Sequence, residues 1–357
     1  MEQFLIKNCS NGAAPKILQM KRYQTQNTRY KILFMGTPEF AAPALERLIK
    51  AGYKILAVIT APDKPIGRKQ KITPPPIKKM ALRYKIPVLQ PEKILNLKPK
   101  LSNLFESSAE HKKFVLRSQI SNLNPDLIVV AAYGKIIPKE ILEIPKYGSL
   151  NIHPSFLPKY RGPSPIQFAI LNGEKITGAT IMLMDEKMDH GPILAQEKIA
   201  LRPDETSQTL HQKLSQLGAD LLIKTIPQYL ERKIRPKPQD EKKATYTKIL
   251  TRDDGRIDWQ KSAKELERQV RAFFPWPGAW TELRINLPVM QALRAGNQES
   301  RRLKILKAKA VNKKIPNALP TGQGYLLPEI IQLEGKKQMS WEEFLRGHKK
   351  VNIESGI

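Results

Sequence analysis

Residues 149–165 read SLNIHPSFLPKYRGPSP, and the rest of the chain is organised around them. Asn151 and His153 lie two residues apart, so on an extended strand their side chains share one face. Pro154 and Pro158 then prevent a helix and keep the following segment irregular. A polar pair at the end of a strand, followed by a stiff loop, is how open α/β sheets build their sites. The stretch therefore predicts a site at the carboxyl edge of a sheet.

A second hydrophobic run, TGATIMLMD at 177–185, predicts a neighbouring strand. The turn MDHG at 188–191 follows it and brings the Asp189 carboxylate to a comparable place. An Asn-x-His pair without such context is a weak signal, because a histidine near a strand end is more often structural than catalytic. In this context, an amide, an imidazole and a carboxylate would surround one spot. Asn151, His153 and Asp189 are therefore the candidate catalytic residues.

The first part of the chain after residue 28 has a β-α-β pattern. The pattern predicts strands at 31–35, 55–60 and 126–132, and a helix at 43–50 between the first two. The turn GTPEF at 36–40 is not G-x-G-x-x-G, and no G-x-x-x-x-G-K-[ST] is present. Neither dinucleotide binding nor nucleotide hydrolysis is supported. The expected fold class is α/β, with a Rossmann-like N-terminal domain and a long helix at 204–230.

A proline- and lysine-rich segment at 61–79 is expected to be a loop. A loop of this length is either functional or disordered. Its cations could pair with phosphates, and they are Lys64, Arg68, Lys69 and Lys71. The alternative is a solvated basic loop without a ligand. The charged, aperiodic residues 98–118 are expected to form a surface insertion.

Composition restricts the class of protein. The chain has 357 residues, enough for two domains with sizeable cores. Its single cysteine, Cys9, excludes a disulfide framework, and no ligand spacing indicates a metal. No run approaches the length of a membrane span. The formal net charge of +28 favours a polyanionic partner and salt-sensitive binding, unless the lysines are only a solvated surface.

Residues 1–28 are polar and basic without clear periodicity, and we expect a disordered extension there. They are poor in acids, as a transit peptide is, but they carry Glu2 and lack an arginine-rich amphipathic face. A cytoplasmic location is expected, and an organellar matrix is the alternative.

Beyond residue 230 the composition changes. Residues 231–248 are charged and contain two prolines, which predicts a linker between a domain at 29–230 and another at 249–357. In the second domain we expect strands at 255–259 and 302–311, a helix at 263–272 and a rigid aromatic turn at 274–280. A small β-barrel with basic strands suits oligonucleotide binding. The aromatic residues are expected to be core and not stacking platforms.

The run from 149 to 191 resembles, almost position for position, the signature of the formyltetrahydrofolate-dependent formyltransferases. The turns GTPEF at 36–40 and AYG at 132–134 match further landmarks of that family. The resemblance implies 10-formyltetrahydrofolate as co-substrate and no metal. It also implies folate contacts from six residues: Tyr133, Gly134, Ser155, Phe156, Leu157 and Pro158.

The candidate residues suit formyl transfer to an amine. The amine must attack as a free base, so Asp189 is expected to accept its proton, directly or through a water. The Asn151 amide and a protonated His153 are expected to stabilise the oxyanion. His153 is also the expected proton donor to the departing folate nitrogen.

The flanking sequence resembles those members of the family that formylate the α-amino group of methionyl initiator tRNA for translation initiation. The resemblance implies that a basic loop with Arg68, Lys64, Lys69 and Lys71 contacts the tRNA acceptor stem. It also implies a C-terminal oligonucleotide-binding-fold domain, through ATY at 244–246, IDW at 257–259, PWP at 275–277 and GKKQMS at 335–340. A monomer is expected. Residues 285–300 look longer than the family pattern and 311–321 shorter, so the barrel could be incomplete.

Three alternatives stay open. A formyltransferase for a sugar-nucleotide amine or a purine precursor would not need the basic loop or the C-terminal domain. A formyltetrahydrofolate hydrolase would use water in place of the amine and would also be expected to lack them. A nucleic-acid-binding module with an inactive site would bind tRNA without folate turnover.

Overall fold

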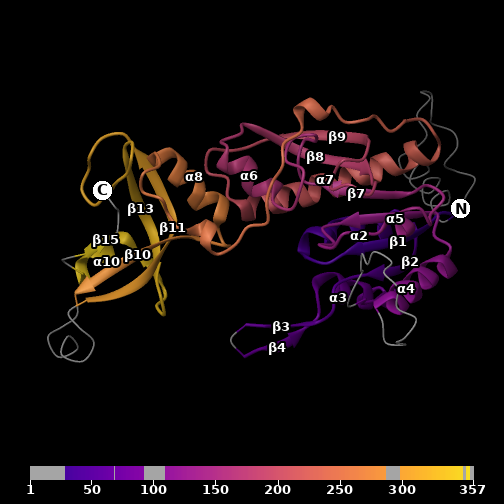
Figure 1. The fold of residues 1–357 in the computed structure, drawn as a ribbon, viewed down its shortest axis with the longest axis horizontal. Coiled ribbons are helices and arrows are strands. Elements are labelled where there is room, and N and C mark those ends of the chain that lie inside the picture. Colours follow the sequence, from indigo (N-terminus) through magenta and orange to yellow (C-terminus); the bar gives the residue numbers. More distant parts are fainter. Residues whose placement is uncertain (1–28, 68, 92–108, 287–297, 349–350, 354–357) are drawn as a thin grey trace, which may run out of the picture. The chain divides into compact units, whose positions relative to one another are not determined.

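The computed structural model describes residues 29–67, 69–91, 109–286, 298–348 and 351–353 (Figure 1). The expected extension at 1–28 and the expected tRNA contact Arg68 lie outside these residues. The chain divides into two compact units. The first holds the residues up to 152 with 181–187 and 219–236, and the second holds 153–180, 188–218 and everything from 237.

A seven-stranded sheet has the order β5-β2-β1-β6-β7-β8-β9. Its strands are β1 (Lys31–Gly36), β2 (Lys54–Ile59), β5 (Val88–Leu89), β6 (Leu127–Ala131), β7 (Ser149–His153), β8 (Ile176–Leu183) and β9 (Ile193–Ala200). The pairings of β1 with β2 and β6, of β2 with β5, and of β6 with β7 are parallel. The chain goes from β1 to β2 on one side and later to β6 on the other. Ligands of open α/β sheets bind at the carboxyl ends of the strands beside such a reversal.

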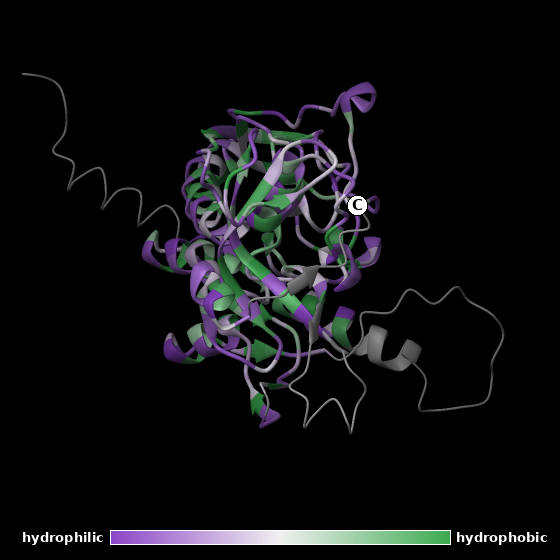
Figure 2. Cartoon of the chain, turned by 90° about the vertical axis from the view of Figure 1, so that its left-hand side faces the viewer, coloured by the Kyte–Doolittle hydropathy of each residue, from purple (hydrophilic) through white to green (hydrophobic). Residues whose placement is uncertain are grey.

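The central strands are hydrophobic along their whole length because both faces of the sheet are covered. All five residues of β6 are buried. One core cluster joins Leu33 of β1 and Ile128 of β6 with Leu116 and Ile120 of α4 (Ala109–Leu123). Figure 2 shows the same segregation, with hydrophobic residues in the inner strands and hydrophilic residues on the outer turns.

The turns at the carboxyl edge of this sheet are joined by one threonine. Thr37 follows β1, and its Oγ1 donates a hydrogen bond of 3.2 Å to the carbonyl oxygen of Tyr133, which follows β6. The same Oγ1 accepts a bond of 3.3 Å from the amide of Ala61, which follows β2. The GTPEF and AYG turns therefore belong to one connected edge.

The expected loop at 61–79 is more regular than its prolines suggested. It contains the antiparallel pair β3 (Lys64–Ile66) and β4 (Lys71–Thr73), and it ends in the first turn of α3 (Pro76–Arg83). Proline at the start of a helix removes an amide that has no partner there. Proline is also tolerated in an edge strand, as at Pro65. The prediction of a loop was therefore wrong for the β3–β4 hairpin and for the start of α3.

The expected aperiodic insertion at 98–118 is wrong in its second half, because α4 begins at Ala109. Leu116 and Ile120 are four residues apart and both are buried. These two residues, one turn apart, pack this part of the helix against the sheet, yet they are hidden among charged neighbours in the sequence. Residues 98–108 lie outside the described chain.

The other helices of this part are α2 (Ala42–Lys50), α5 (Lys139–Leu142), α6 (Pro165–Leu171) and α7 (Ser207–Leu230). The expected helices at 43–50 and 204–230 are confirmed by α2 and α7. Across the described ranges, no helix is both long enough and apolar enough to span a bilayer.

The C-terminal part forms an antiparallel half-barrel in the order β12-β13-β11-β10-β15, with β14 also paired to β13 (Figure 1). Its strands are β10 (Ala279–Asn286), β11 (Gln298–Val311), β12 (Leu319–Pro320), β13 (Tyr325–Leu333), β14 (Gln338–Ser340) and β15 (Val351–Ile353). The helices are α8 (Ala263–Phe273), which buries Leu266 and Val270 against β11 and β13, and α10 (Trp341–Gly347). The expected class, α/β with a C-terminal domain like an oligonucleotide-binding fold, is confirmed.

The expected strand at 255–259 is wrong. Asp253–Gly255 form a short 3-10 turn, η3, and only Arg256 makes an isolated bridge, to Trp280. Ile257 and Trp259 are nevertheless buried in the core under α8. Their alternation in the sequence reflects burial of an irregular segment and not strand pairing.

Candidate active site

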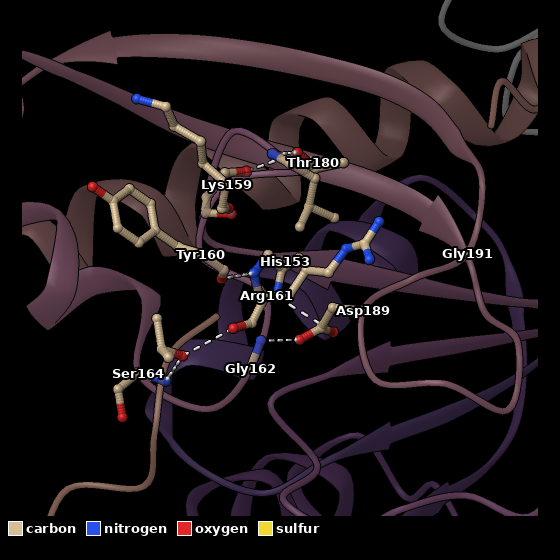
Figure 3. Close-up of polar contacts among 12 residues, drawn as sticks. His153, Lys159, Tyr160, Arg161, Gly162, Ser164, Thr180, Asp189 and Gly191 are labelled. Atoms are coloured by element: carbon tan, nitrogen blue, oxygen red, sulfur yellow. Dashed lines mark hydrogen bonds and ion pairs between the residues drawn. The ribbon is translucent and has the colours of Figure 1, made fainter. Parts of the chain in front are cut away.

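His153 is the last residue of β7, and both of its ring nitrogens face protein groups. The ring is buried, with 4% of the residue exposed. Nε2 lies 2.9 Å from the carbonyl oxygen of Tyr160, which can only accept, so Nε2 carries a proton. Nδ1 faces Oδ1 of Asp189 at 3.6 Å (Figure 3). The nitrogen that can change its protonation is therefore the one beside the carboxylate.

Asp189 lies in the turn between β8 and β9, in the left-handed conformation with φ of +49°. Aspartate tolerates this conformation better than most side chains do. Its Oδ2 accepts a hydrogen bond of 2.7 Å from the amide of Gly162. Its carbonyl oxygen and that of Gly191 both accept from Nε2 of Gln239, each at 2.8 Å. The carboxylate is thus fixed through its backbone and through one of its oxygens.

Gly162 is required by the close approach of a neighbouring segment. Its φ is +108°, and an added Cβ would lie 2.7 Å from the carbonyl oxygen of Thr247. Any side chain here would push that segment away and move the amide that holds Asp189.

Residues 245–247 support the loop that carries Tyr160 and Gly162. Thr245 accepts the amide of Tyr160 through Oγ1 and the amide of Arg161 through its carbonyl oxygen, both at 2.8 Å. The amide of Thr247 donates to the carbonyl oxygen of Arg161 at 2.7 Å. The ATY motif, expected as a landmark of the C-terminal domain, therefore lies beside the candidate site.

Arg161, between Tyr160 and Gly162 in this loop, is fully buried. Its guanidinium donates two hydrogen bonds to Gln239, at 3.0 and 2.9 Å, and two to the carboxylate of Glu241, at 2.9 and 2.6 Å. A fifth bond, of 3.1 Å, goes to the hydroxyl of Tyr246. The Glu241 carboxylate, against the effect of burial, raises the pKa of Arg161. The planar fork matches the arrangement of its acceptors, which a lysine could not do.

The sequence pattern assigns no role to Arg161, Gln239 or Thr245. The one available signal is an arginine between prolines in the central stretch, a poor place for a merely solvated charge. Its partners Gln239 and Glu241 are 78 and 80 residues away in the sequence, so no local pattern connects them.

Tyr160 keeps its hydroxyl neutral. Burial raises its pKa to about 12, and the hydroxyl donates to Glu174 at 2.7 Å. The ring thereby anchors the loop in which the Tyr160 carbonyl oxygen accepts the hydrogen bond from His153 Nε2.

The candidate folate segment at 155–158 is held by two polar side chains from the sheet. Thr180 of β8 donates to the carbonyl oxygen of Ser155 at 2.7 Å and accepts the amide of Leu157 at 3.2 Å. Gln196 of β9 donates to the carbonyl oxygen of Leu157 at 2.8 Å and to Oγ1 of Thr180 at 2.9 Å. Because the Leu157 amide is satisfied internally, this segment would meet a ligand mainly through its side chains.

Those side chains are largely apolar. Leu157 is buried, and Phe156 is half-buried with the Lys198 ammonium 4.9 Å from its ring centre. The hydroxyl of Ser155 donates to the carbonyl oxygen of Lys159 at 2.6 Å, which closes the turn that contains Pro158. The segment presents an apolar wall rather than a row of free hydrogen-bonding groups.

Tyr133 and Gly134, the other expected folate contacts, follow β6 in the first compact unit. The Tyr133 side chain belongs to the core cluster, and burial raises the pKa of its hydroxyl. Among the described residues, this hydroxyl has no hydrogen-bond partner. Asn151 is half-buried on β7, in register with Val130 of β6.

The expected tRNA-contacting cations lie on or beside the β3–β4 hairpin. Lys64 of β3, Lys71 of β4 and Lys69 in the turn between them are exposed, and Arg68 is outside the described residues. Ile66 and Ile72 of the same hairpin are 60% and 69% exposed. In the described chain, no group of three or more His, Cys, Asp or Glu side chains could hold a metal ion.

Comparison with known proteins places this arrangement in a class. Residues 29–226 match the formyl transferase family, and residues 249–349 match the formyl transferase C-terminal domain. The chain belongs to the formyl transferase family, and it carries both of these domains. The resemblance expected from the sequence motifs is confirmed.

Two methionyl-tRNA formyltransferases are examples of the most similar curated relatives. That of Thermodesulfovibrio yellowstonii is 44% identical over 318 residues, which are 89% of this chain and 96% of the relative. That of Caldanaerobacter subterraneus is 41% identical over 338 residues, which are 91% and 98% of the two chains.

Among solved structures, the N-formyltransferase of Helicobacter canadensis, crystallised with folinic acid and dTDP-3-aminofucose, has a TM-score of 0.56. It is 19% identical and covers 85% of this chain and 98% of its own. At this identity, the likeness describes the fold alone.

Proposed function

We propose that the chain transfers the formyl group of 10-formyltetrahydrofolate to the α-amino group of methionyl initiator tRNA. The observation that carries this function is the match to methionyl-tRNA formyltransferases along almost their whole length, at 44% and 41% identity. The matched length includes the C-terminal domain at 249–349. Both substrates follow from the activity of these relatives.

Asp189 is the proposed base for the attacking amine. Its Oδ2 is occupied by the Gly162 amide, which leaves Oδ1 to take the amine proton directly or through a water. Its side chain is 15% exposed, so the carboxylate is reachable yet largely desolvated. A partly desolvated carboxylate with one fixed oxygen has a defined direction for accepting a proton.

His153 is the proposed acid. With Nε2–H donated to the Tyr160 carbonyl, the only nitrogen that can gain and release a proton is Nδ1, beside Asp189. A charged imidazolium there would stabilise the developing oxyanion and protonate the departing folate nitrogen. The Asn151 amide, two residues earlier on β7, is the proposed second donor to the oxyanion.

The folate co-substrate fits the apolar wall at 155–158. Phe156 and Pro158, which are both half-buried, would contact its ring, and the buried Leu157 would support them from the core. Thr180 and Gln196 hold the segment in place. Ser155 would act by closing the turn. Tyr133 and Gly134 are proposed to contribute through the backbone, because the Tyr133 ring is part of the core.

The remaining assignments are also proposals. Residues 29–230 are the proposed catalytic domain, 231–248 the linker, and 249–357 the tRNA-binding domain. The hairpin with Lys64, Arg68, Lys69 and Lys71 is the proposed contact with the acceptor stem, supported by the exposure of its described lysines. A monomer in the cytoplasm is the proposed working form.

The test is formyl transfer from 10-formyltetrahydrofolate to charged initiator methionyl-tRNA, with charged elongator methionyl-tRNA and no tRNA as controls. Transfer confined to the initiator is the expected result. Folate turnover without formylated tRNA would overturn the tRNA assignment in favour of a hydrolase or a small-molecule acceptor. Binding of tRNA without any folate turnover would identify a binding module with an inactive site.

A further inference from the structure

A pocket of about 350 Å³ lies in the C-terminal part of the chain. The residues that matter to it are Arg252, Trp276, Trp280, Arg302, Lys304 and Glu334. They come from the segment before α8, the turn before β10, the strands β10 and β11, and the end of β13 (Figure 1). All belong to one compact unit. The volume is at the lower end of the range for small-molecule sites, about 300–1,000 Å³.

The pocket has an excess of positive charge. Arg252, Arg302 and Lys304 line it together with a single carboxylate, Glu334, whose Oε2 accepts the backbone amide of Arg302 at 3.3 Å. Within the described residues, none of these three cations forms an ion pair. The next lysines of β11 differ, since Lys307 and Lys309 are both paired with Glu329, at 2.9 and 2.5 Å.

One tryptophan of the pocket is exposed, against the expectation that the aromatic turn is core. Trp276 is 52% exposed, whereas Trp280 is 6% exposed. The Trp280 ring lies under the Arg302 guanidinium, 4.2 Å from the ring centre, and its Nε1 donates to the carbonyl oxygen of Arg252 at 2.9 Å. Trp280 therefore stacks against the Arg302 guanidinium and holds the backbone of Arg252, and the indole of Trp276 stays accessible beside them.

An accessible indole next to cations is the combination with which proteins bind single-stranded nucleic acids. A base stacks on the aromatic face, and the cations take the phosphate. We infer that this pocket binds one unpaired nucleotide of an RNA, with its base on Trp276 and its phosphate at Arg252, Arg302 and Lys304. An acidic peptide would use the same charges but would have no flat group for the indole.

The identity of the RNA rests on the proposed function, because the nucleotide would belong to the tRNA substrate. The pocket itself does not depend on formyl transfer, so the two can fail separately.

Intrinsic fluorescence can report this site directly. The chain has four tryptophans, and the other three, Trp259, Trp280 and Trp341, are 3%, 6% and 3% exposed. Titration of the full chain with a single-stranded RNA hexanucleotide is expected to quench the exposed indole. Inorganic polyphosphate, which has charge but no bases, is expected to leave the emission nearly unchanged. Equal quenching by both would overturn the nucleotide in favour of a plain anion site.

Variants separate stacking from charge. Affinities of the variants are measured by the anisotropy of a fluorescently labelled hexanucleotide, because substitution of Trp276 removes the reporting indole. Trp276→Ala is expected to weaken hexanucleotide binding by about 5- to 100-fold, the range for loss of one stacked base, whereas Trp276→Phe retains most of the affinity. Lys304→Gln is expected to weaken binding and flatten its salt dependence. The matched control is Lys307→Gln, on the same strand but paired with Glu329, which is expected to have a smaller effect. Unchanged affinity in Trp276→Ala and Lys304→Gln would overturn the inference.

Formylation kinetics distinguish the two proposals. If the wild-type chain formylates initiator tRNA and Trp276→Ala raises the KM for tRNA without lowering kcat, both hold. If the wild type formylates and Trp276→Ala changes neither hexanucleotide affinity nor KM, the pocket inference fails alone. If the wild type does not formylate but its hexanucleotide quenching disappears in Trp276→Phe, the proposed function fails and the pocket stands. Thermal unfolding of each variant checks that the fold is retained.

Discussion

His153 and Asp189 form a pair whose geometry sets the direction of proton transfer. The Tyr160 carbonyl fixes the proton on Nε2, so any proton exchanged with a substrate passes through Nδ1 or through Asp189 Oδ1, 3.6 Å apart. The nearby Glu186 could not take over this role, because its exposed carboxylate pairs with Lys139 at 3.4 Å on the surface.

We predict that Asp189→Asn lowers kcat for formyl transfer by about a hundredfold or more, the usual size for loss of a general base. Asparagine can keep the left-handed backbone and still accept the Gly162 amide, so the fold is expected to persist. His153→Ala is expected to have a similar effect on kcat. Steady-state kinetics with saturating tRNA provide the measurement, and Glu186→Gln is the control. A rate near that of the wild type in either variant would refute the mechanism.

For single residues, the sequence is informative where chemistry is local. The spacing of Asn151 and His153, together with the turn that holds Asp189, is enough to predict an imidazole beside a carboxylate. The sequence could not place Arg161, whose partners Gln239 and Glu241 are remote in the chain. It also failed at Trp276, because a proline-flanked aromatic run is compatible with either a buried or an exposed indole.

Among the elements, the start of α7 has an unusual buried acid. Glu205 is fully buried, and its carboxylate contacts Lys213 at 2.6 Å and the hydroxyl of Thr209. Burial alone would raise the pKa of Glu205, but the hydrogen bonds from Lys213 and Thr209 together outweigh it, and the pKa is lowered from its ordinary 4.5. The segment is also tied to α8, because Arg271 donates to the Glu205 carbonyl oxygen at 2.9 Å.

We predict that Glu205→Gln lowers the free energy of unfolding at neutral pH by about 1.5–3 kcal/mol, the range for a hydrogen bond to a charged group. The folded-state pKa is below the unfolded one, so this stabilisation is present above about pH 4.5 and is lost as the pH falls through the folded value. The difference between wild type and variant should therefore shrink in acid. Denaturant titrations at neutral and acidic pH measure it, with the exposed Asp204→Asn as control. A difference that does not change with pH would contradict the assignment.

Strands with a continuous apolar run and helices bounded by clear start or stop signals were predictable, including β1, β2, β6, α2, α7 and α8. The misses share a cause. The strands of the β3–β4 hairpin are almost fully exposed, so no buried apolar residues mark them in the sequence. In α4, the buried residues Leu116 and Ile120 stand among polar and charged neighbours, so the hydrophobic pattern is weak there too. Conversely, Ile257 and Trp259 alternate like a strand because both are buried, although the backbone around them is irregular.

For the whole molecule, the net charge of +28 predicts that tRNA binding depends strongly on salt. We predict that Lys64→Gln combined with Lys71→Gln flattens the slope of log K against log salt by roughly one to two, since each phosphate contact contributes about 0.7–0.9. Filter binding or fluorescence anisotropy over a range of salt concentrations gives the slope. Lys54→Gln, an exposed lysine at the opposite, amino end of β2, is the control and should leave the slope nearly unchanged. An unaltered slope in the double variant would make the hairpin a solvated surface.

The sequence was most informative for the whole molecule, because each family signature is a short motif that can be recognised independently of the rest of the chain. The α/β class, the two domains of the formyl transferase family and the two substrates were all expected. Charge alone did not distinguish a tRNA from any other polyanion, and it was the motifs that made the choice.

The buried Arg161 has a consequence for any attempt to cut the protein into independent pieces. The family match of the N-terminal domain ends at residue 226, yet the five hydrogen bonds of this guanidinium end on Gln239, Glu241 and Tyr246. A truncation at residue 230 would strand a desolvated charge and release the backbone of Asp189 from Gln239. The boundary of the family match, at residue 226, therefore differs from the boundary set by the contacts of the site. The smallest catalytic fragment that keeps these contacts extends at least through Thr247.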